Sequence, residues 1–237
     1  MRNILFFDTE TTGLPKNWDA PVTDFDNWPR LVQLAWQIYN SKGDLIEEKE
    51  YIIRPEGFII PKDSNNIHKI TTEIALAQGV NLNLVLNDFI SITRDSSLLV
   101  AHNYDFDSKI IGSEFLRNGF DNVLSNQKSL CTMKSSVNFC KIVGPNGYKW
   151  PKLSELYKIL FNKSFNEHNA LDDVKATSKC FWELYKQNVI SFGEQQEQRK
   201  LKTAKEFLSN SLYSTVFKKE SRTYAEYNSK LCILLLE

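Results

Sequence analysis

Ten residues near the start of the chain decide its fold: Ile4-Leu5-Phe6-Phe7-Asp8-Thr9-Glu10-Thr11-Thr12-Gly13. The first four are apolar without alternation, which is typical of a strand buried on both faces. Because Asp8 follows at once, the run is too short for a membrane span or a signal peptide. Side chains two apart in a strand face the same side, so we expect Asp8 and Glu10 to point together from its end.

Two carboxylates held this close repel one another unless a cation lies between them. Carboxylate oxygens are the ligands that Mg²⁺ and Mn²⁺ prefer. On Asp8 and Glu10 alone, a metal site and a pair of acids in a solvated loop are about equally well supported.

Outward from this run, the sequence alternates between strand and helix patterns. Leu31–Tyr39 and Leu45–Ile53 predict two strands joined by a turn, so an antiparallel meander opens the fold. The further elements that we predict are helices at 71–77 and 82–92, a strand at 98–101, a helix at 106–116, a strand at 129–133, and helices at 153–160 and 170–186. The pattern predicts an α/β domain over residues 1–188. Residues 189–237 begin charged and Gln-rich, and we expect a helical or partly disordered C-terminal extension.

Composition narrows the class of protein without identifying it. The 237 residues are enough for one full-sized domain, and 42% are hydrophobic, as in ordinary globular proteins. Twenty-nine basic residues balance 29 acidic ones, so a nucleic-acid partner has to be argued from local charge and metal ions. The four cysteines form no C-x-x-C pair, which favours free, buried thiols in a reducing compartment. We therefore expect a cytoplasmic protein without membrane association.

Two later stretches carry further acids and histidines: Ala101-His102-Asn103-Tyr104-Asp105-Phe106-Asp107 and His168-Asn169-Ala170-Leu171-Asp172-Asp173. The first lies where a predicted strand passes into a helix, and the second lies at a predicted helix start. Together with Asp8–Gly13 they resemble, in order, the three motifs of the DEDDh 3′→5′ exonucleases. This family includes the proofreading exonuclease subunit of bacterial DNA polymerase III.

The resemblance covers about residues 1–188. A further family element, I-H-G-I-T, is similar to Ile67-His68-Lys69-Ile70-Thr71, in which Lys69 replaces the glycine. The family's fold implies a ribonuclease H-like domain, with a mixed central sheet of about five strands flanked by helices.

The resemblance also implies a catalytic site. It assigns His168 as the base that takes a proton from water, and it assigns two divalent ions, Mg²⁺ or Mn²⁺, to the ligands Asp8, Glu10, Asp107 and Asp173. The F-D pairing of the second motif favours Asp107 over Asp105, and the five-residue spacing of the third favours Asp173 over Asp172. Whether Asp105 or Asp172 shares in metal binding stays open. We expect His102 and His68 to have structural roles.

Substrate contacts are expected at Thr9, Gly13, Leu14 and Asn103. Gly13 permits a tight turn or a close approach, and Leu14 is either a wedge against the terminal bases or an ordinary loop leucine. The segment from Lys128 to Lys158 holds six lysines and one acid, interleaved with aromatic residues. Single-strand binding and a solvated face over core aromatics explain this segment equally well, so none of its residues is assigned to the site.

These assignments predict a 3′→5′ exonuclease that releases nucleoside 5′-monophosphates from a nucleic acid with a free 3′ end, with single-stranded DNA favoured. One alternative is an RNA-directed exoribonuclease of the same family. Another is a non-catalytic nucleic-acid-binding module on this fold, against which the complete set of five residues argues. An endonuclease on a ribonuclease H-like fold lacks the histidine and aspartate at this spacing. A homodimer and an association with a polymerase both stay open.

Overall fold

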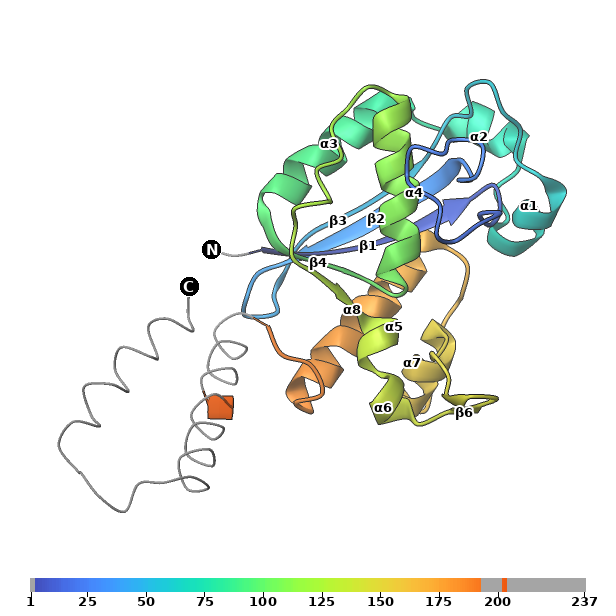
Figure 1. Ribbon diagram of the computed structural model, residues 1–237. Coiled ribbons are helices and arrows are strands. Elements are labelled where there is room, and N and C mark those ends of the chain that lie inside the picture. Colours follow the sequence, from blue (N-terminus) through green and yellow to red (C-terminus); the bar gives the residue numbers. More distant parts are fainter. Residues whose placement is uncertain (1–2, 193–201, 204–237) are drawn as a thin grey trace, which may run out of the picture. The chain divides into compact units, whose positions relative to one another are not determined.

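Five strands form one mixed sheet in the computed structural model, which describes residues 3–192 and 202–203 (Figure 1). The strands are β1 (Asn3–Thr11), β2 (Leu31–Tyr39), β3 (Leu45–Ile52), β4 (Ser96–Ala101) and β5 (Ser129–Cys131), in the order β3-β2-β1-β4-β5. The pairs β1–β2 and β2–β3 are antiparallel, whereas β1–β4 and β4–β5 are parallel. The predicted opening meander and the mixed sheet of five strands are confirmed.

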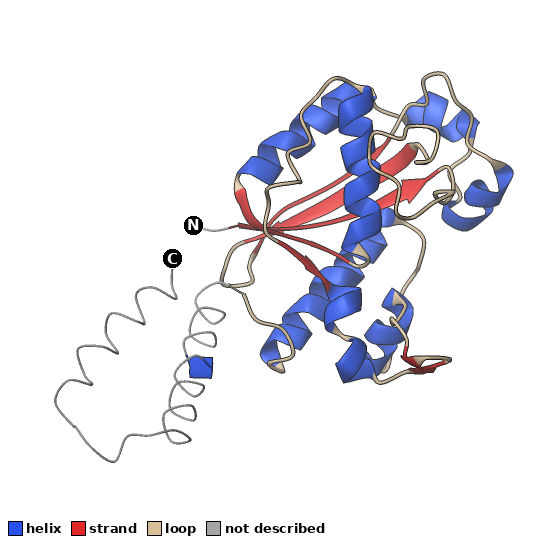
Figure 2. Cartoon of the chain, in the orientation of Figure 1, coloured by secondary structure: helices blue, strands red, loops and turns tan. Residues whose placement is uncertain are grey.

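Helices flank the sheet on both sides (Figure 2). On one side, α3 (Leu82–Arg94) and α4 (Tyr104–Arg117) share a core cluster with Leu5 and Phe7 of β1. On the other side lies α8 (Ala170–Lys186), whose Phe181 ring is 5.0 Å from the ring of Phe6. Because strand side chains alternate, the even-numbered residues of β1 face α8. Asp8 and Glu10 continue that series, and Thr9 belongs to the α4 side.

Several short elements complete the described part of the chain. They are α1 (Lys62–His68), α2 (Thr72–Gln78), α5 (Thr132–Ser135), α6 (Val137–Cys140), a hairpin of β6 (Val143–Gly144) and β7 (Gly147–Tyr148), and α7 (Leu153–Phe161). The strand predicted at 129–133 is too long, since it ends at Cys131 and α5 follows. The predictions missed α1, whose sequence KDSNNIH has no apolar periodicity, and the hairpin, whose strands have two residues each.

The chain divides into two units, Met1–Ile190 and Ser191–Glu237. Almost all of the second unit lies outside the described residues, and so does the extension expected at 189–237. No helix in residues 3–192 or 202–203 is both long and apolar enough to cross a membrane. Of the four cysteines, Cys131, Cys140 and Cys180 are described and free, and only Cys180 is fully buried.

Candidate active site

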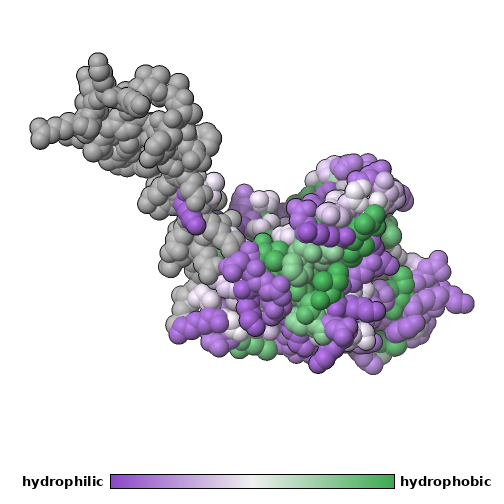
Figure 3. Space-filling view, turned by 90° about the horizontal axis from the view of Figure 1, so that it is seen from below, coloured by the Kyte–Doolittle hydropathy of each residue, from purple (hydrophilic) through white to green (hydrophobic). Residues whose placement is uncertain are grey.

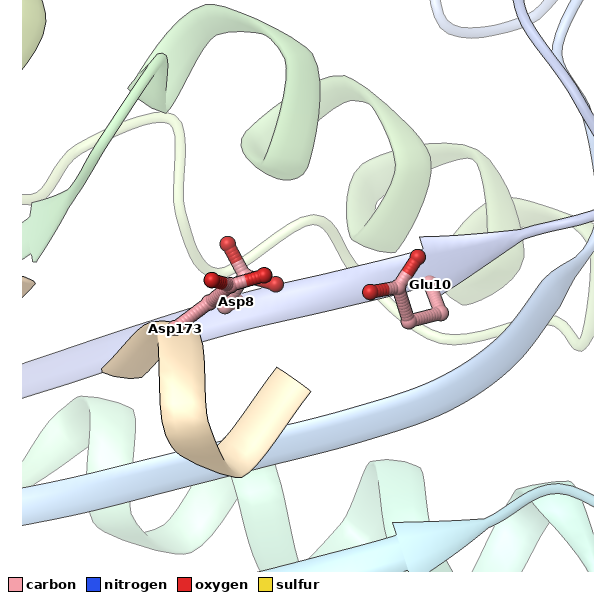
Figure 4. Close-up of side chains that lie close together, drawn as sticks. All are labelled: Asp8, Glu10 and Asp173. Atoms are coloured by element: carbon pink, nitrogen blue, oxygen red, sulfur yellow. The ribbon is translucent and has the colours of Figure 1, made fainter. Parts of the chain in front are cut away.

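Three carboxylates from two elements meet on the α8 side of the sheet. Asp8 and Glu10 extend from β1, and Asp173 extends from the first turn of α8 (Figure 4). One oxygen of each lies within 4.8 Å of the others, so the three side chains can hold one metal ion. Alternation along β1 puts Asp8 and Glu10 on one face, and the docking of α8 against that face brings Asp173 to them.

A fourth carboxylate, Asp107, approaches from α4. It is 2% exposed and lies in the first turn of that helix. The backbone N–H and the hydroxyl of Thr9 donate to Oδ1 of Asp107 at 3.1 and 2.7 Å. The last residue of β1 paired with β4 is Phe6, and β4 ends at Ala101. Beyond Phe6 the β1–β4 pairing stops, and Asp107 accepts the Thr9 N–H that β4 does not reach.

Burial and mutual repulsion make these four groups hard to ionise together. Burial, followed by the charge of Asp173, raises the pKa of Glu10 to about 8. Burial also raises the pKa of Asp107 and of Asp173 to about 7 each, against the hydrogen bonds from Thr9 and from the His168 N–H. The pKa of Asp8 lies well above its usual range because it is buried beside the other three.

The cluster has the composition of a site for a hard divalent cation. Among the described residues, no salt bridge joins a lysine or arginine to any of the four carboxylates. A group of acids that are buried or partly buried and have no basic partner is unfavourable unless a cation supplies the positive charge. All four side chains offer oxygen ligands, which fit Mg²⁺ or Mn²⁺.

His168 is placed beside Asp173 by the backbone. Its own N–H donates to Oδ2 of Asp173 at 3.2 Å, and its φ of 71° puts it in the left-handed region. Asn169 then caps α8 by accepting from the N–H groups of Leu171 and Asp172, both at 3.1 Å. The His168 side chain is exposed, so its ring reaches solvent at the rim of the carboxylate cluster.

The neighbouring acids of the two doublets lie elsewhere. Asp105 is exposed and forms an ion pair with Lys134. Asp172 accepts a hydrogen bond of 2.9 Å from the side chain of Asn166. Asp107 and Asp173 are therefore the members of the doublets that face Asp8 and Glu10.

The other two histidines are held within the fold. His102 lies 3.0 Å from the Thr132 hydroxyl and 3.1 Å from the Pro151 carbonyl through its two ring nitrogens, and burial lowers its pKa to about 4. His68 is buried, and its Nδ1 accepts from the Ile70 N–H at 3.1 Å. Lys69, where the family motif has glycine, ends α1 at φ 64°, a conformation that glycine adopts without strain.

The residues expected to touch substrate surround the first and second motifs. Thr9 is buried and its hydroxyl is committed to Asp107. Gly13 has φ 150°, which favours glycine, and Leu14 after it is 73% exposed. Asn103 precedes α4 in the left-handed region, at φ 77°. Leu14 therefore has the most accessible side chain among these residues.

Sequence reasoning missed a buried amide that holds the start of α8. Gln33, directly opposite Glu10 on β2, is 2% exposed. Its Oε1 accepts from the Ala170 N–H at 3.0 Å, and its Nε2 donates to Glu50 at 2.5 Å. The Asn169 side chain donates to the same Glu50 oxygen at 3.0 Å. The signal was present, because Gln33 and Gln37 are the two amides in the otherwise apolar or aromatic stretch LVQLAWQIY.

Comparisons with known proteins identify the family and the fold. The model of the exonuclease family RNase_T matches residues 5–181. Among solved structures, a zinc-bound complex of E. coli exonuclease I with single-stranded DNA superposes with a TM-score of 0.63 at 22% identity, covering 79% of this chain and 41% of that one. E. coli exonuclease I with a dA16 oligonucleotide gives 0.63 at 20% identity, covering 78% and 41%.

A product-bound exonuclease I gives a TM-score of 0.60 at 20% identity, covering 78% of this chain and 43% of that one. The chain therefore spans about two fifths of the length of these proteins. At these identities the likeness shows the fold alone, and it matches the predicted ribonuclease H-like exonuclease fold. No curated protein sequence matches significantly.

Proposed function

The chain belongs to the RNase_T exonuclease family and is a nuclease of the DEDDh type, and from that premise we propose that it removes single nucleotides from the 3′ end of single-stranded DNA with the help of two divalent cations. The observation that carries this proposal is the cluster of the partly buried Asp8, Glu10 and Asp173 with the buried Asp107, and with His168 at its rim. We assign the activity to residues 1–188 and none of the chemistry to the residues that follow.

The four carboxylates hold the cations, which we take to be Mg²⁺ or Mn²⁺. Asp8 lies among the other three, whose charges all raise its pKa, and it would be the most central ligand of the metal site. When bound, such ions activate a water molecule and neutralise charge on the phosphodiester. A zinc-bound form of E. coli exonuclease I is known, and the choice of metal here is a matter for titration.

His168 accepts a proton from the attacking water molecule. The water oxygen forms a bond to the terminal phosphorus, the bond from phosphorus to the 3′ oxygen of the preceding nucleotide breaks, and that oxygen takes up a proton from solvent. The products are a nucleoside 5′-monophosphate and a strand one nucleotide shorter. Histidine is the side chain most often used as a general base, and an exposed ring on a left-handed residue before a capped helix is suited to reach the water.

Single-stranded DNA is the proposed substrate because structures of the same fold are complexes of exonuclease I with dA16 and dT13 oligonucleotides. Leu14, exposed at the end of the first motif, is suited to separate the last two bases. Recognition of RNA would require contacts to the 2′-hydroxyl. None of the site residues named above is assigned such a contact.

The test uses single-stranded and double-stranded DNA and RNA, each labelled at the 5′ end, with Mg²⁺, Mn²⁺ or a chelator. We expect a ladder of products shortened from the 3′ end of single-stranded DNA, release of nucleoside 5′-monophosphates, and no reaction with chelator. Release of the labelled 5′ nucleotide, internal cleavage, or turnover in chelator would each overturn the proposal. If RNA were shortened faster than DNA, RNA would be the substrate and the proposed chemistry would be unchanged.

A further inference from the structure

Positive charge is concentrated in the segment between the second and third motifs. Residues 128–163 contain seven lysines and one acid, Glu155, in a chain whose total charge is zero. Lys134 pairs with Asp105, and Lys149 pairs with Glu155 at 2.6 Å. The remaining five have no ion-pair partner among the described residues: Lys128, Lys141, Lys152, Lys158 and Lys163.

The hairpin β6–β7 turns apolar side chains toward solvent in the middle of this segment. Tyr148 and Trp150 are two residues apart, and Val143 pairs with Tyr148 across the hairpin. Their exposed fractions are 80% for Val143, 50% for Tyr148 and 62% for Trp150. We call these three side chains the hairpin face.

The orientation of the hairpin face is fixed by the residue between its two rings. Lys149 reaches Oε1 of Glu155 on α7, and the Lys152 N–H donates to Oε2 of the same carboxylate at 2.8 Å. Since neighbouring side chains in an extended chain point to opposite sides, Tyr148 and Trp150 point away from this anchor. Both carboxylate oxygens of the only acid in the segment are thus engaged and do not oppose an anion at the hairpin face.

The hairpin face is connected to the second motif by a hydrogen bond of the residue that follows it. Trp150 is followed by Pro151, whose carbonyl lies 3.1 Å from Nε2 of His102. His102 stands at the end of β4, directly before Asn103 and the helix that carries Asp107. Burial lowers the pKa of His102 to about 4, so this ring is neutral near pH 7.

A second basic feature lies at the other end of α7. Lys158, Asn162, Lys163 and Ser164 line an open depression of about 510 Å³. Asn162, Lys163 and Ser164 begin the loop between α7 and α8, and the same loop ends at His168 and Asn169. The elements α6, α7 and β6 lie on the lower side of the molecule in Figure 1, and the view of that side in Figure 3 shows apolar surface between hydrophilic flanks. Exposed rings thus lie on the hairpin that precedes α7, and unpaired lysines lie at the C-terminal end of α7.

We propose that the hairpin face, together with Lys158 and Lys163, is a docking surface for the single strand 5′ to the nucleotide being removed. The proposal rests on the proposed function for its direction and adds a binding surface outside the catalytic cluster. Bases stack on Tyr148 and Trp150, and the phosphates contact the unpaired lysines. A protein partner is the less favoured occupant, since a surface with unpaired lysines and exposed aromatic rings is complementary to a polyanion with π-faces.

The experiment compares a Tyr148→Ala/Trp150→Ala variant and a Lys158→Gln/Lys163→Gln variant with wild type. Leu84→Ala is the matched control for an exposed apolar residue, on α3, and Lys42→Gln/Lys62→Gln is the control for two exposed lysines without ion pairs. Binding of a fluorescent oligothymidylate of about 20 nucleotides is followed by anisotropy with chelator present. Hydrolysis is measured as the ratio of kcat/KM for the same oligonucleotide to kcat/KM for a dinucleotide.

We expect the ring variant to bind the oligonucleotide roughly 10- to 100-fold more weakly, because stacking on each ring is lost. We expect the lysine variant to flatten the plot of log Kd against log salt by about 1.4, or about 0.7 for each lost phosphate contact. Both variants lower the hydrolysis ratio, whereas both controls keep the wild-type affinity, salt slope and ratio.

Wild-type affinity and ratio in the two surface variants would overturn the proposal while leaving the proposed function intact. That result is also what a protein-docking role for the face predicts. If no substrate is hydrolysed but anisotropy still depends on the hairpin rings and the α7 lysines, the proposed function fails and the docking surface stands. Melting curves of all four variants exclude loss of fold as the cause.

Discussion

Both hydrogen bonds that Thr9 donates end on one atom, Oδ1 of Asp107, at 3.1 Å from the backbone N–H and 2.7 Å from the hydroxyl. Thr9 lies between Asp8 and Glu10, so the strand that carries two of the carboxylates also orients the one that arrives from α4. Side chains that orient metal ligands commonly change metal affinity or activity when they are replaced.

Thr9→Val is expected to lower kcat/KM by about 10- to 100-fold and to raise the Mg²⁺ concentration needed for half-maximal rate. Valine keeps the shape and the backbone N–H and removes the hydroxyl that donates to Asp107. Thr9→Ser keeps the donor and should stay within a few-fold of wild type. Steady-state rates over a Mg²⁺ titration check both, and equal curves for Val and wild type would show that this hydrogen bond does not matter.

Replacement of His168 should slow the chemical step by about 10²–10⁴-fold while metal binding is kept. His168→Asn is the better variant, because asparagine tolerates the positive φ of this position more readily than alanine does. The N–H that donates to Asp173 is retained in either case. Single-turnover rates across pH provide the measurement. A wild-type rate in His168→Asn would assign the base to another group.

Asp8→Asn is expected to abolish hydrolysis and at the same time to stabilise the metal-free protein at alkaline pH. The cations lose their central ligand, and the cluster loses the charge that repels Asp107, Asp173 and Glu10. Asp105→Asn is the control, because Asp105 is exposed and paired with Lys134; it should leave the rate within a few-fold of wild type. Turnover is measured beside melting temperature with chelator. Near-full turnover in Asp8→Asn would refute the assignment of the metal site.

The parts of the fold that follow from periodicity could be predicted from the sequence. Alternation along β1 predicts that Asp8 and Glu10 share a face, and the helical pattern of residues 170–186 predicts α8 with the bounds that the structure has. The approach of Asp107 and Asp173 to β1 could not be derived from spacing, because about 100 and 165 residues separate them from Asp8. Their proximity depends on β4 pairing with β1 and on α8 docking over β1 and β2; only the resemblance to a family anticipated it.

The basic, aromatic segment shows another limit of sequence reasoning. Tyr157 and Trp150 are both aromatic residues among lysines, yet Tyr157 packs with Phe161 and Phe165 while Trp150 is exposed. The difference arises from the ion pair of Lys149 with Glu155, and the strands of the hairpin are too short to show an alternating pattern of apolar and polar residues. The composition of the segment does not predict which of its aromatic side chains are exposed, because this depends on the path of the backbone.

Gln33→Leu is expected to reduce activity through the position of α8, since it leaves the Ala170 N–H and Glu50 without their amide partner. Gln37 offers a matched control on the same strand. Its side chain donates to Glu48 at 2.6 Å and accepts from the Ser178 hydroxyl at 2.7 Å, farther along α8 from the site. Each leucine variant should lose roughly 1–3 kcal/mol of unfolding free energy.

Only Gln33→Leu should also lower kcat, because only Gln33 bonds the residue that begins α8, two positions after His168. Denaturant unfolding and steady-state kinetics on both variants separate the two effects. A loss of kcat in Gln37→Leu as large as in Gln33→Leu would mean that general destabilisation, not the position of the helix start, lowers the rate.

The metal-free protein should lose stability as pH rises from about 4 to about 8. In the folded chain Glu10 has a pKa of about 8, and Asp107 and Asp173 have pKa values of about 7. Unfolded carboxylates titrate near pH 4, so between these limits the folded state binds more protons than the unfolded state. The free energy of unfolding then falls with rising pH.

Cations that replace those protons should restore the free energy of unfolding, so Mg²⁺ should raise the melting temperature more at about pH 8.5 than at about pH 5.5. Melting curves with Mg²⁺ or chelator at both pH values give the difference directly, and Asp8→Asn should show a smaller one. An equal Mg²⁺ effect at the two pH values would mean that the carboxylates are ionised without a cation, and the electrostatic case for a metal site would fail.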